Sequence, residues 1–221
     1  MNIIFVLFDG VTQLDFTGPA QFLSRLPGGT IHVAAKSVAP IETDSGFSIM
    51  PTTTFLDCPQ ADIICIPGGH GVADAIGDAK IVDFVQKQSA DATWVTSVCT
   101  GAFILGAAEL LKGKNATTHW GYTHLLEKFG ATYQCARVVR DGTLITSGGV
   151  TSGIDFALEL IGEISGEDAA RSVQLSLEYD PAPPFIGGTP DTSPEMIVAN
   201  MRARFYDAAA ARMEIAIGAL V

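Results

Sequence analysis

Cys99 is the residue whose position most favours nucleophilic chemistry. It lies in the segment TWVTSVCTGAFILGAAELL (residues 93–111), between a β-branched run typical of a strand and an apolar run typical of a buried helix. A thiol in such a turn lies close to the unpaired N–H groups and the dipole of a helix that begins near Gly101. Both features lower the pKa of a thiol, so we expect a nucleophile; the alternative is a small buried thiol in a narrow corner.

A carboxyl group, that of Asp15, lies between Leu14 and Phe16 in the segment DGVTQLDFTGP (residues 9–19). One interpretation makes it the N-cap of the helix that follows. The other places it opposite Cys99, where it would move protons to and from a substrate. Its apolar neighbours are compatible with the raised pKa that a proton donor needs.

The turn Gly68-Gly69-His70-Gly71 is a third candidate. Its backbone N–H groups could approach a developing negative charge, as in an anion nest, although a tight turn alone would also explain the glycines. We expect the remaining histidines to be packing or surface groups and the remaining cysteines to be buried thiols: His32, His119, His124, Cys58, Cys65 and Cys135.

Strand-like and helix-like runs alternate along the chain, which predicts a mostly parallel sheet with helices on both faces. Strands are expected over residues 2–8, 30–37, 61–69 and 93–96, hairpins over 40–51 and 136–149, and helices over 17–26, 79–90, 102–111, 119–130, 151–166, 166–179 and 195–220. A proline-rich loop is expected between the last two helices. Ligands bind beyond the carboxyl ends of such strands, and Asp15, Gly68–His70 and Cys99 should all meet at that edge.

The composition favours a single α/β domain over residues 1–221. Of 221 residues, 48% are hydrophobic and 17% charged, and the net charge of −11 disfavours binding to nucleic acid or to an anionic membrane surface. The longest apolar runs fall short of the ~20 residues of a membrane-spanning helix, and the N-terminus lacks the features of a signal peptide. Four scattered cysteines without metal-ligand spacing indicate a reducing compartment, the cytoplasm.

Several of these segments resemble a known family. IPGGHG, SVCTGAFILGAAELLKGKNATTHW and LITSGGVTSGIDFALELI are similar to the PfpI-type branch of the class I glutamine amidotransferase-like superfamily. Within that branch, TQLDFTGPAQFL and SLEYDPAPPF resemble the isonitrile (isocyanide) hydratases. The resemblance extends from Asn2 to about Phe205.

The resemblance implies a flavodoxin-like three-layer α/β sandwich, a homodimer, and no metal or organic cofactor. It also implies that Cys99 is the nucleophile, that Asp15 is its acid/base partner, and that Thr100 positions substrate or water. The backbone around Gly69 and His70 would face the reacting group. The implied reaction converts an isonitrile, R–N≡C, and water into an N-substituted formamide.

The sequence also departs from several relatives. PfpI-like peptidases have His after the cysteine, where this chain has Thr100, and no histidine follows His124 to serve as the base of an amidotransferase. A hydratase needs no histidine: a Cys99 thiolate would add to the isonitrile carbon with Asp15 supplying a proton, and water would hydrolyse the resulting thioimidate. The alternatives are an oxidative-stress sensor based on Cys99 and a glyoxalase- or deglycase-like enzyme.

A dimer is also indicated by apolar residues near the C-terminus. The loop EYDPAPPFIGGTP (residues 178–190) is hydrophobic for an exposed segment. One face of the last helix is apolar and would either pair with a second copy or pack on its own sheet; it comprises Met196, Val198, Met201, Phe205 and Met213.

Overall fold

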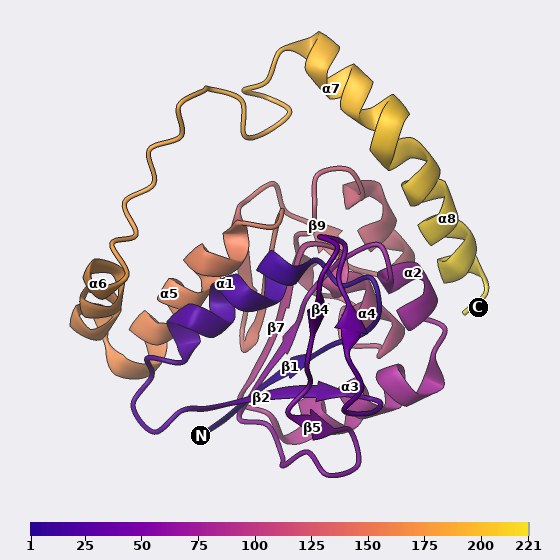
Figure 1. Ribbon diagram of the computed structural model, residues 1–221. Helices are drawn as coiled ribbons and strands as arrows, with labels where there is room; N and C mark the ends of the chain where they lie inside the picture. Colours follow the sequence, from indigo (N-terminus) through magenta and orange to yellow (C-terminus); the bar gives the residue numbers. More distant parts are fainter. Residues whose placement is uncertain (221) are drawn as a thin grey trace.

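A seven-stranded sheet forms the centre of the computed structural model, which describes residues 1–220 (Figure 1). The strand order is β10-β11-β7-β6-β1-β2-β5, and all neighbours are parallel except β10, which pairs antiparallel with β11. The mostly parallel sandwich expected from the sequence is therefore confirmed. The strands are β1 (Asn2–Val6), β2 (Thr30–Ala35), β5 (Thr53–Thr54), β6 (Ile63–Ile66), β7 (Trp94–Val98), β10 (Val138–Asp141) and β11 (Leu144–Ser147).

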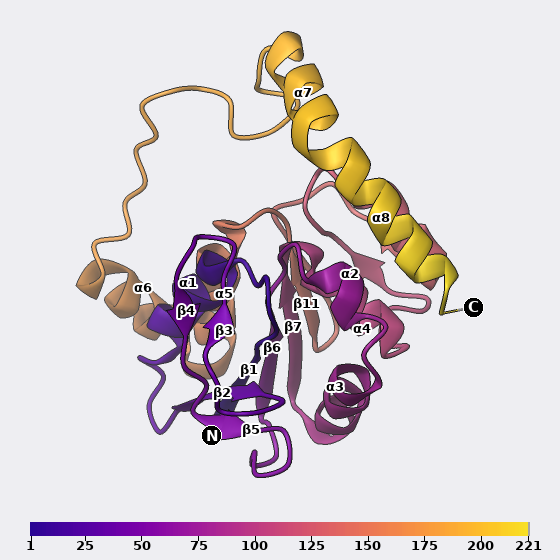
Figure 2. The ribbon, with the colours of Figure 1, turned by 45° about the vertical axis from the view of Figure 1, so that its right-hand side comes forward.

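Helices cover both faces of the sheet. Figure 2 shows the sheet nearly edge-on, with α1 and α5 on one side and α2, α3 and α4 on the other. The α-helices are α1 (Gln13–Leu23), α2 (Val72–Ala75), α3 (Ala79–Asp91), α4 (Ala102–Ala107), α5 (Ser152–Ser165), α6 (Glu167–Ser176), α7 (Glu195–Met201) and α8 (Asp207–Gly218). Two 3-10 segments, η1 (Cys99–Gly101) and η2 (Thr123–Phe129), and a π-helical turn, η3 (Arg202–Tyr206), complete the helical elements.

Two small strand pairs lie outside the main sheet. The pair β3 (Ile41–Glu42) and β4 (Ser48–Ile49) is the hairpin expected over residues 40–51. The pair β8 (Asn115–Ala116) and β9 (Thr132–Tyr133) is parallel and has no counterpart among the expected elements. No helix within residues 1–220 has the length and hydropathy that crossing a membrane requires.

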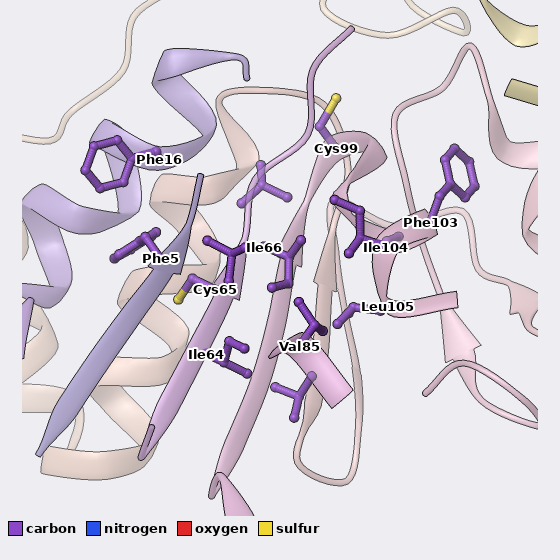
Figure 3. Close-up of a cluster of buried hydrophobic side chains, with 14 of the residues drawn as sticks. Phe5, Phe16, Ile64, Cys65, Ile66, Val85, Cys99, Phe103, Ile104 and Leu105 are labelled. Carbon is purple, nitrogen blue, oxygen red and sulfur yellow. The ribbon is translucent and has the colours of Figure 1, made fainter. Parts of the chain in front are cut away.

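The central strands are apolar throughout because both of their faces are covered. Every residue of β6 is buried, and Phe5 of β1 packs edge-on against Phe16 of α1 with ring centroids 5.1 Å apart. Figure 3 shows that pair to one side of β6, with Ile104 of α4 to the other. Each fully buried side chain of this size stabilises the fold by about 1.5–3 kcal/mol.

The element boundaries differ from the sequence prediction in several places. The expected helix over residues 195–220 is divided by a π-helical turn, and α2 and β5 are not among the expected elements. Helix α1 begins at Gln13, four residues before the expected start at Thr17, so that Pro19 is an interior residue. Helix α4 ends at Ala107 rather than near residue 111, because the chain turns at Glu109 with a φ of 63°. The segment expected to be a helix over residues 119–130 is shorter and 3-10 in character, although it stops at Gly130, as predicted.

The C-terminal segment lies partly outside the layers. Figure 1 shows α7 and α8 as one continuous rod, joined to α6 by a long connection that runs away from the sheet. Helix α8 packs on α2, where Arg212 donates to Asp74 at 2.7 Å and Met213 is buried. The other half of the rod is more open, and Met196 is 73% exposed. The apolar face of the last helix thus packs on the core only along α8.

Candidate active site

The backbone at Cys99 is held in an unusual conformation. Cys99 follows β7 and has a φ of 56°, in the left-handed region that non-glycine residues rarely adopt. Its N–H donates to the carbonyl of Gly148 at 2.8 Å, and its carbonyl accepts from Thr118 Oγ1 at 2.7 Å. A Cβ at Gly101 would lie 2.1 Å from the carbonyl oxygen of Ile66, so only glycine fits there. This elbow directs the sulfur beyond the end of the strand (Figure 3).

Burial controls the protonation of the Cys99 thiol. The residue is only 6% exposed, and burial raises its pKa well above the ordinary value; the negative charge of Asp15 raises it further. Hydrogen bonds from the backbone and side chain of Thr100 act in the opposite direction but do not compensate. The expected lowering of this pKa is therefore wrong for the resting site. The helix dipole is weak here, since α4 has only six residues after a 3-10 turn.

Asp15 is completely buried beside the cysteine. It lies in the first turn of α1 rather than at its N-cap, which is Thr12, so the N-cap interpretation is wrong. Asp15 Oδ2 accepts from the Gly68 N–H at 2.9 Å, while Oδ1 has no hydrogen-bond partner within residues 1–220. Burial raises the pKa of Asp15 from 3.8 to about 7, against the opposing effect of the Gly68 hydrogen bond. At neutral pH the carboxyl group can therefore both accept and donate a proton.

The glycine turn fixes Asp15 and Thr100 in place. The Gly69 N–H donates to Thr100 Oγ1 at 3.0 Å, so this amide is already engaged within the site. A Cβ at Gly68 would lie 2.7 Å from Thr100 Oγ1 and 2.9 Å from Asp15 Oδ2. Three stretches that are distant in the sequence thus meet at the carboxyl edge of the sheet, as predicted.

A chamber of about 150 Å³ opens over Cys99. Thr100, Gly69 and His70 line it, in agreement with the expectation that they face this space. Further lining residues were not singled out as site residues from the sequence: Thr12, Asp44, His119, Tyr122, Val150 and Tyr206. They come from loops and from the C-terminal rod, and no periodic pattern marks them. Thr12, His119 and Val150 do lie within the segments that resemble the family, but those segments alone do not show which of their residues face the chamber.

His119 is a wall of the chamber as well as a packing residue. It is buried between Trp120 and Tyr206, with ring centroids 5.5 Å and 4.9 Å away. Burial lowers its pKa to about 4, so the ring is neutral at pH 7, and Nδ1 accepts from the Gly121 N–H at 3.2 Å. No hydrogen bond within residues 1–220 joins His119 to Cys99. The arrangement is a Cys–Asp pair beside a neutral imidazole rather than a Cys–His dyad.

The other cysteines lie away from the chamber. Cys65 is buried in β6, and burial raises its pKa to about 12, as expected for a core thiol. Cys58 is half-buried, with a pKa raised to about 11 by burial. The expectation that Cys135 is buried is wrong: it is exposed, because it follows the edge strand β9.

His32 and His124 play no part in the chamber walls. His32 pairs with Asn2 Oδ1 at 3.1 Å, and His124 is exposed. Among the described residues, no group of three His, Cys, Asp or Glu side chains is placed to hold a metal ion.

Comparisons with known proteins agree with the fold. The model of the DJ-1/PfpI family matches residues 1–163. The isonitrile hydratase of Pseudomonas putida is 51% identical over 215 residues, which are 97% of this chain and 94% of that protein. The crystal structure of a THiJ/PfpI family protein from Pseudomonas syringae superposes with a TM-score of 0.91 at 40% identity, covering 96% of this chain and 90% of the other. Drosophila melanogaster DJ-1beta is 23% identical over 80% of this chain and 96% of its own length.

Proposed function

This chain belongs to the DJ-1/PfpI family, and we propose that it is an isonitrile hydratase, converting R–N≡C and water into R–NH–CHO. One observation carries the proposal: a buried carboxyl group with a pKa of about 7 lies beside the Cys99 thiol, and no histidine is hydrogen-bonded to that thiol within residues 1–220. The 51% identity to the Pseudomonas putida enzyme supports the same reaction.

The first step of the proposed mechanism is addition of the thiol across the isonitrile carbon. The ionised Asp15 takes the proton of Cys99 as the S–C bond forms, and it returns that proton to the same carbon. The product is a thioimidate, R–N=CH–S–Cys99. The resting thiol is protonated because of its raised pKa, so a base this close speeds the attack by taking the proton.

The second step is hydrolysis of the thioimidate. Asp15, again ionised, accepts a proton from the attacking water and passes that proton to the nitrogen, giving R–NH–CH(OH)–S–Cys99 and leaving Asp15 ionised once more. The C–S bond then breaks, the hydroxyl proton is transferred through Asp15 to the sulfur, and the formamide leaves. Thr100 favours the thiolate of Cys99, and its hydroxyl is itself held by the Gly69 N–H at 3.0 Å.

The oxidation-sensor alternative is less favoured by the same geometry. Oxidation proceeds through the thiolate, and the raised pKa of Cys99 keeps the resting sulfur protonated. No contact in the chamber favours a glyoxalase or deglycase over a hydratase.

The test is formamide production from a panel of alkyl and aryl isonitriles, measured by mass spectrometry. We expect Cys99→Ala to abolish the product and Asp15→Asn to reduce turnover by about 100-fold or more, a typical contribution of a positioned acid/base group. Cys135→Ala is the matched control, since that exposed thiol lies outside the chamber. Normal turnover by Cys99→Ala would refute the mechanism.

The covalent intermediate can be sought separately. Asp15→Asn should still form the thioimidate slowly but has no carboxylate to activate water for its hydrolysis. The intact mass of this variant should therefore show an adduct equal to one isonitrile on Cys99. An adduct on the exposed Cys135, with none on Cys99, would exclude Cys99 as the nucleophile.

We also propose that residues 1–221 form one domain that works as a homodimer in the cytoplasm; Val221 lies outside the described residues. Support for the dimer comes from apolar side chains that are open to solvent in a single chain: Leu175 at 81%, Phe185 at 85% and Ile186 at 90% exposure. All four cysteines are free, as in proteins of reducing compartments. Sedimentation equilibrium that gives a monomer at micromolar concentration would reject the dimer.

A further inference from the structure

Tyr206 reaches the chamber from a part of the chain that the family model does not include. It is the last residue of the π-helical turn between α7 and α8, whereas the DJ-1/PfpI family model matches only residues 1–163. The sheet edge, Asp15 and Cys99 therefore belong to the family core, and Tyr206 is added to them from outside it. Figure 1 shows the rod that carries this turn lying against the core along α8.

The ring of Tyr206 is seated in an aromatic cluster. Its centroid is 4.9 Å from that of His119, 4.7 Å from that of Trp120 and 6.0 Å from that of Tyr122. A Cβ at Gly121 would lie 3.0 Å from the ring, so the backbone of that loop approaches the ring closely. Edge-to-face contacts at these distances fix the orientation of a ring.

The segments on both sides of Tyr206 are anchored to the core. Before it, the Arg202 guanidinium lies over the Trp120 ring at 5.2 Å. After it, Met213 and Ile217 of α8 are buried, and Arg212 bonds to Asp74 of α2. The π-helical turn adds a residue to the rod between these anchors, as π-bulges frequently do at functional sites. The ring is thus held over the chamber.

Tyr206, Tyr122 and Cys99 line the same chamber, and the two phenols respond to the charge on the sulfur. Burial raises the pKa of Tyr206, and the charge of a Cys99 thiolate raises it further. Tyr122 responds to Cys99 in the same way, with its pKa raised to about 12, chiefly by burial. Both phenols therefore bound the space into which a group attached to the Cys99 sulfur would extend.

We propose that Tyr206 is a specificity-determining residue, a wall that limits the size of the R group accepted over Cys99. This inference rests on the proposed function for the identity of the substrate. The chamber volume of about 150 Å³ is well below the ~300–1,000 Å³ of most small-molecule sites, so the position of each wall decides what fits. Tyr206 is the wall that comes from the C-terminal rod.

The first test compares two isonitriles, methyl and cyclohexyl, in three variants. In Tyr206→Ala we expect the ratio of kcat/KM for cyclohexyl over methyl isonitrile to rise by about tenfold or more, the scale on which apolar pockets discriminate by size. Tyr206→Phe keeps the ring, and its ratio should stay within about twofold of wild type. Phe205→Ala, an exposed neighbour in the same turn, is the matched control with an unchanged ratio.

The second test does not depend on turnover. Site-resolved mass spectrometry gives the rates at which iodoacetamide and N-benzyl iodoacetamide alkylate Cys99. Tyr206→Ala should raise the relative rate of the bulky reagent severalfold, and Phe205→Ala should not. If this shift occurs while no isonitrile is hydrated, the wall is supported and the proposed reaction fails. If a folded Tyr206→Ala protein has the same rate ratio of N-benzyl iodoacetamide to iodoacetamide as wild type, Tyr206 is not a wall of the chamber. If that variant does not fold, Tyr206→Leu takes its place with the same expected result.

Discussion

Replacing Asp15 by Asn should stabilise the protein above neutral pH while lowering its turnover by about 100-fold or more. In the folded chain the pKa of Asp15 is raised from 3.8 to about 7, chiefly by burial, so the folded state binds a proton more tightly than the unfolded state does. The contribution of Asp15 to the free energy of unfolding is fully present below about pH 4, and it is lost as the pH rises through about 7 and the buried carboxyl group ionises. At about 1.4 kcal/mol for each pKa unit, ionised Asp15 costs about 4 kcal/mol. Asn carries no such cost.

The geometry allows the amide to fit. An Asn oxygen can still accept from the Gly68 N–H, and the NH₂ group would take the place of Oδ1, which has no partner to lose within residues 1–220. Leaving that NH₂ group unpaired costs about 1–3 kcal/mol, but this penalty is the same at every pH. The pH dependence of the difference between Asp and Asn therefore isolates the ionisation.

Urea unfolding at about pH 4.5 and about pH 8.5 measures this dependence. The free energy of unfolding of Asp15→Asn relative to wild type should increase by about 3–4 kcal/mol between the two pH values, as the pKa of about 7 requires. Asp168→Asn is the control, because that side chain is 98% exposed. A relative change below about 0.5 kcal/mol for Asp15→Asn would mean that the buried carboxylate ionises without penalty, and the reasoning from burial would be wrong.

Three further predictions concern the same site. The kcat/KM for isonitriles should rise with pH and level off above neutral pH, with the midpoint of the rise near pH 7, because only ionised Asp15 accepts the thiol proton. A flat profile from about pH 5.5 to 8.5 would contradict this role. Thr100→Val should lower turnover with little change in Tm, since the hydroxyl lowers the pKa of the Cys99 thiol; unchanged kinetics would remove Thr100 from the mechanism. Gly101→Ala should destabilise the fold by about 2 kcal/mol or more in urea unfolding, since the new Cβ would lie 2.1 Å from the Ile66 carbonyl oxygen. Gly188→Ala is the comparison for packing, because a Cβ there would meet nothing within 4 Å and the residue has no positive φ.

The parts of the site that the sequence predicts are those fixed by local pattern. The alternation of strands and helices is enough to place Asp15, Gly69 and Cys99 at one edge, because parallel strands end on the same side of a sheet. The positions of His119 and Tyr206 at the chamber could not be predicted in this way. Each is brought to the chamber by long-range packing of a loop or of the C-terminal rod, and neither has a spacing that marks it.

The protonation states of the site residues could be predicted from the sequence only in part. The helix-dipole argument for Cys99 uses only neighbouring residues, whereas its raised pKa depends on burial by segments from across the chain. For Asp15 the flanking residues Leu14 and Phe16 gave the correct direction, because they lie in the same buried turn of α1. Local sequence predicts desolvation only where the local element itself is buried.

The attachment of the C-terminal rod also affects the order in which the site matures during synthesis. A ribosome releases the chain from its N-terminus, and the segments that form the sheet and α1 to α5 emerge before Tyr206 does. Until the rod docks through Arg212 and Asp74, the Cys99 sulfur lacks its wall on that side. A nascent or prematurely terminated chain of this protein therefore presents a more accessible thiol than the finished molecule, and it is the form that electrophiles in the cell would modify first.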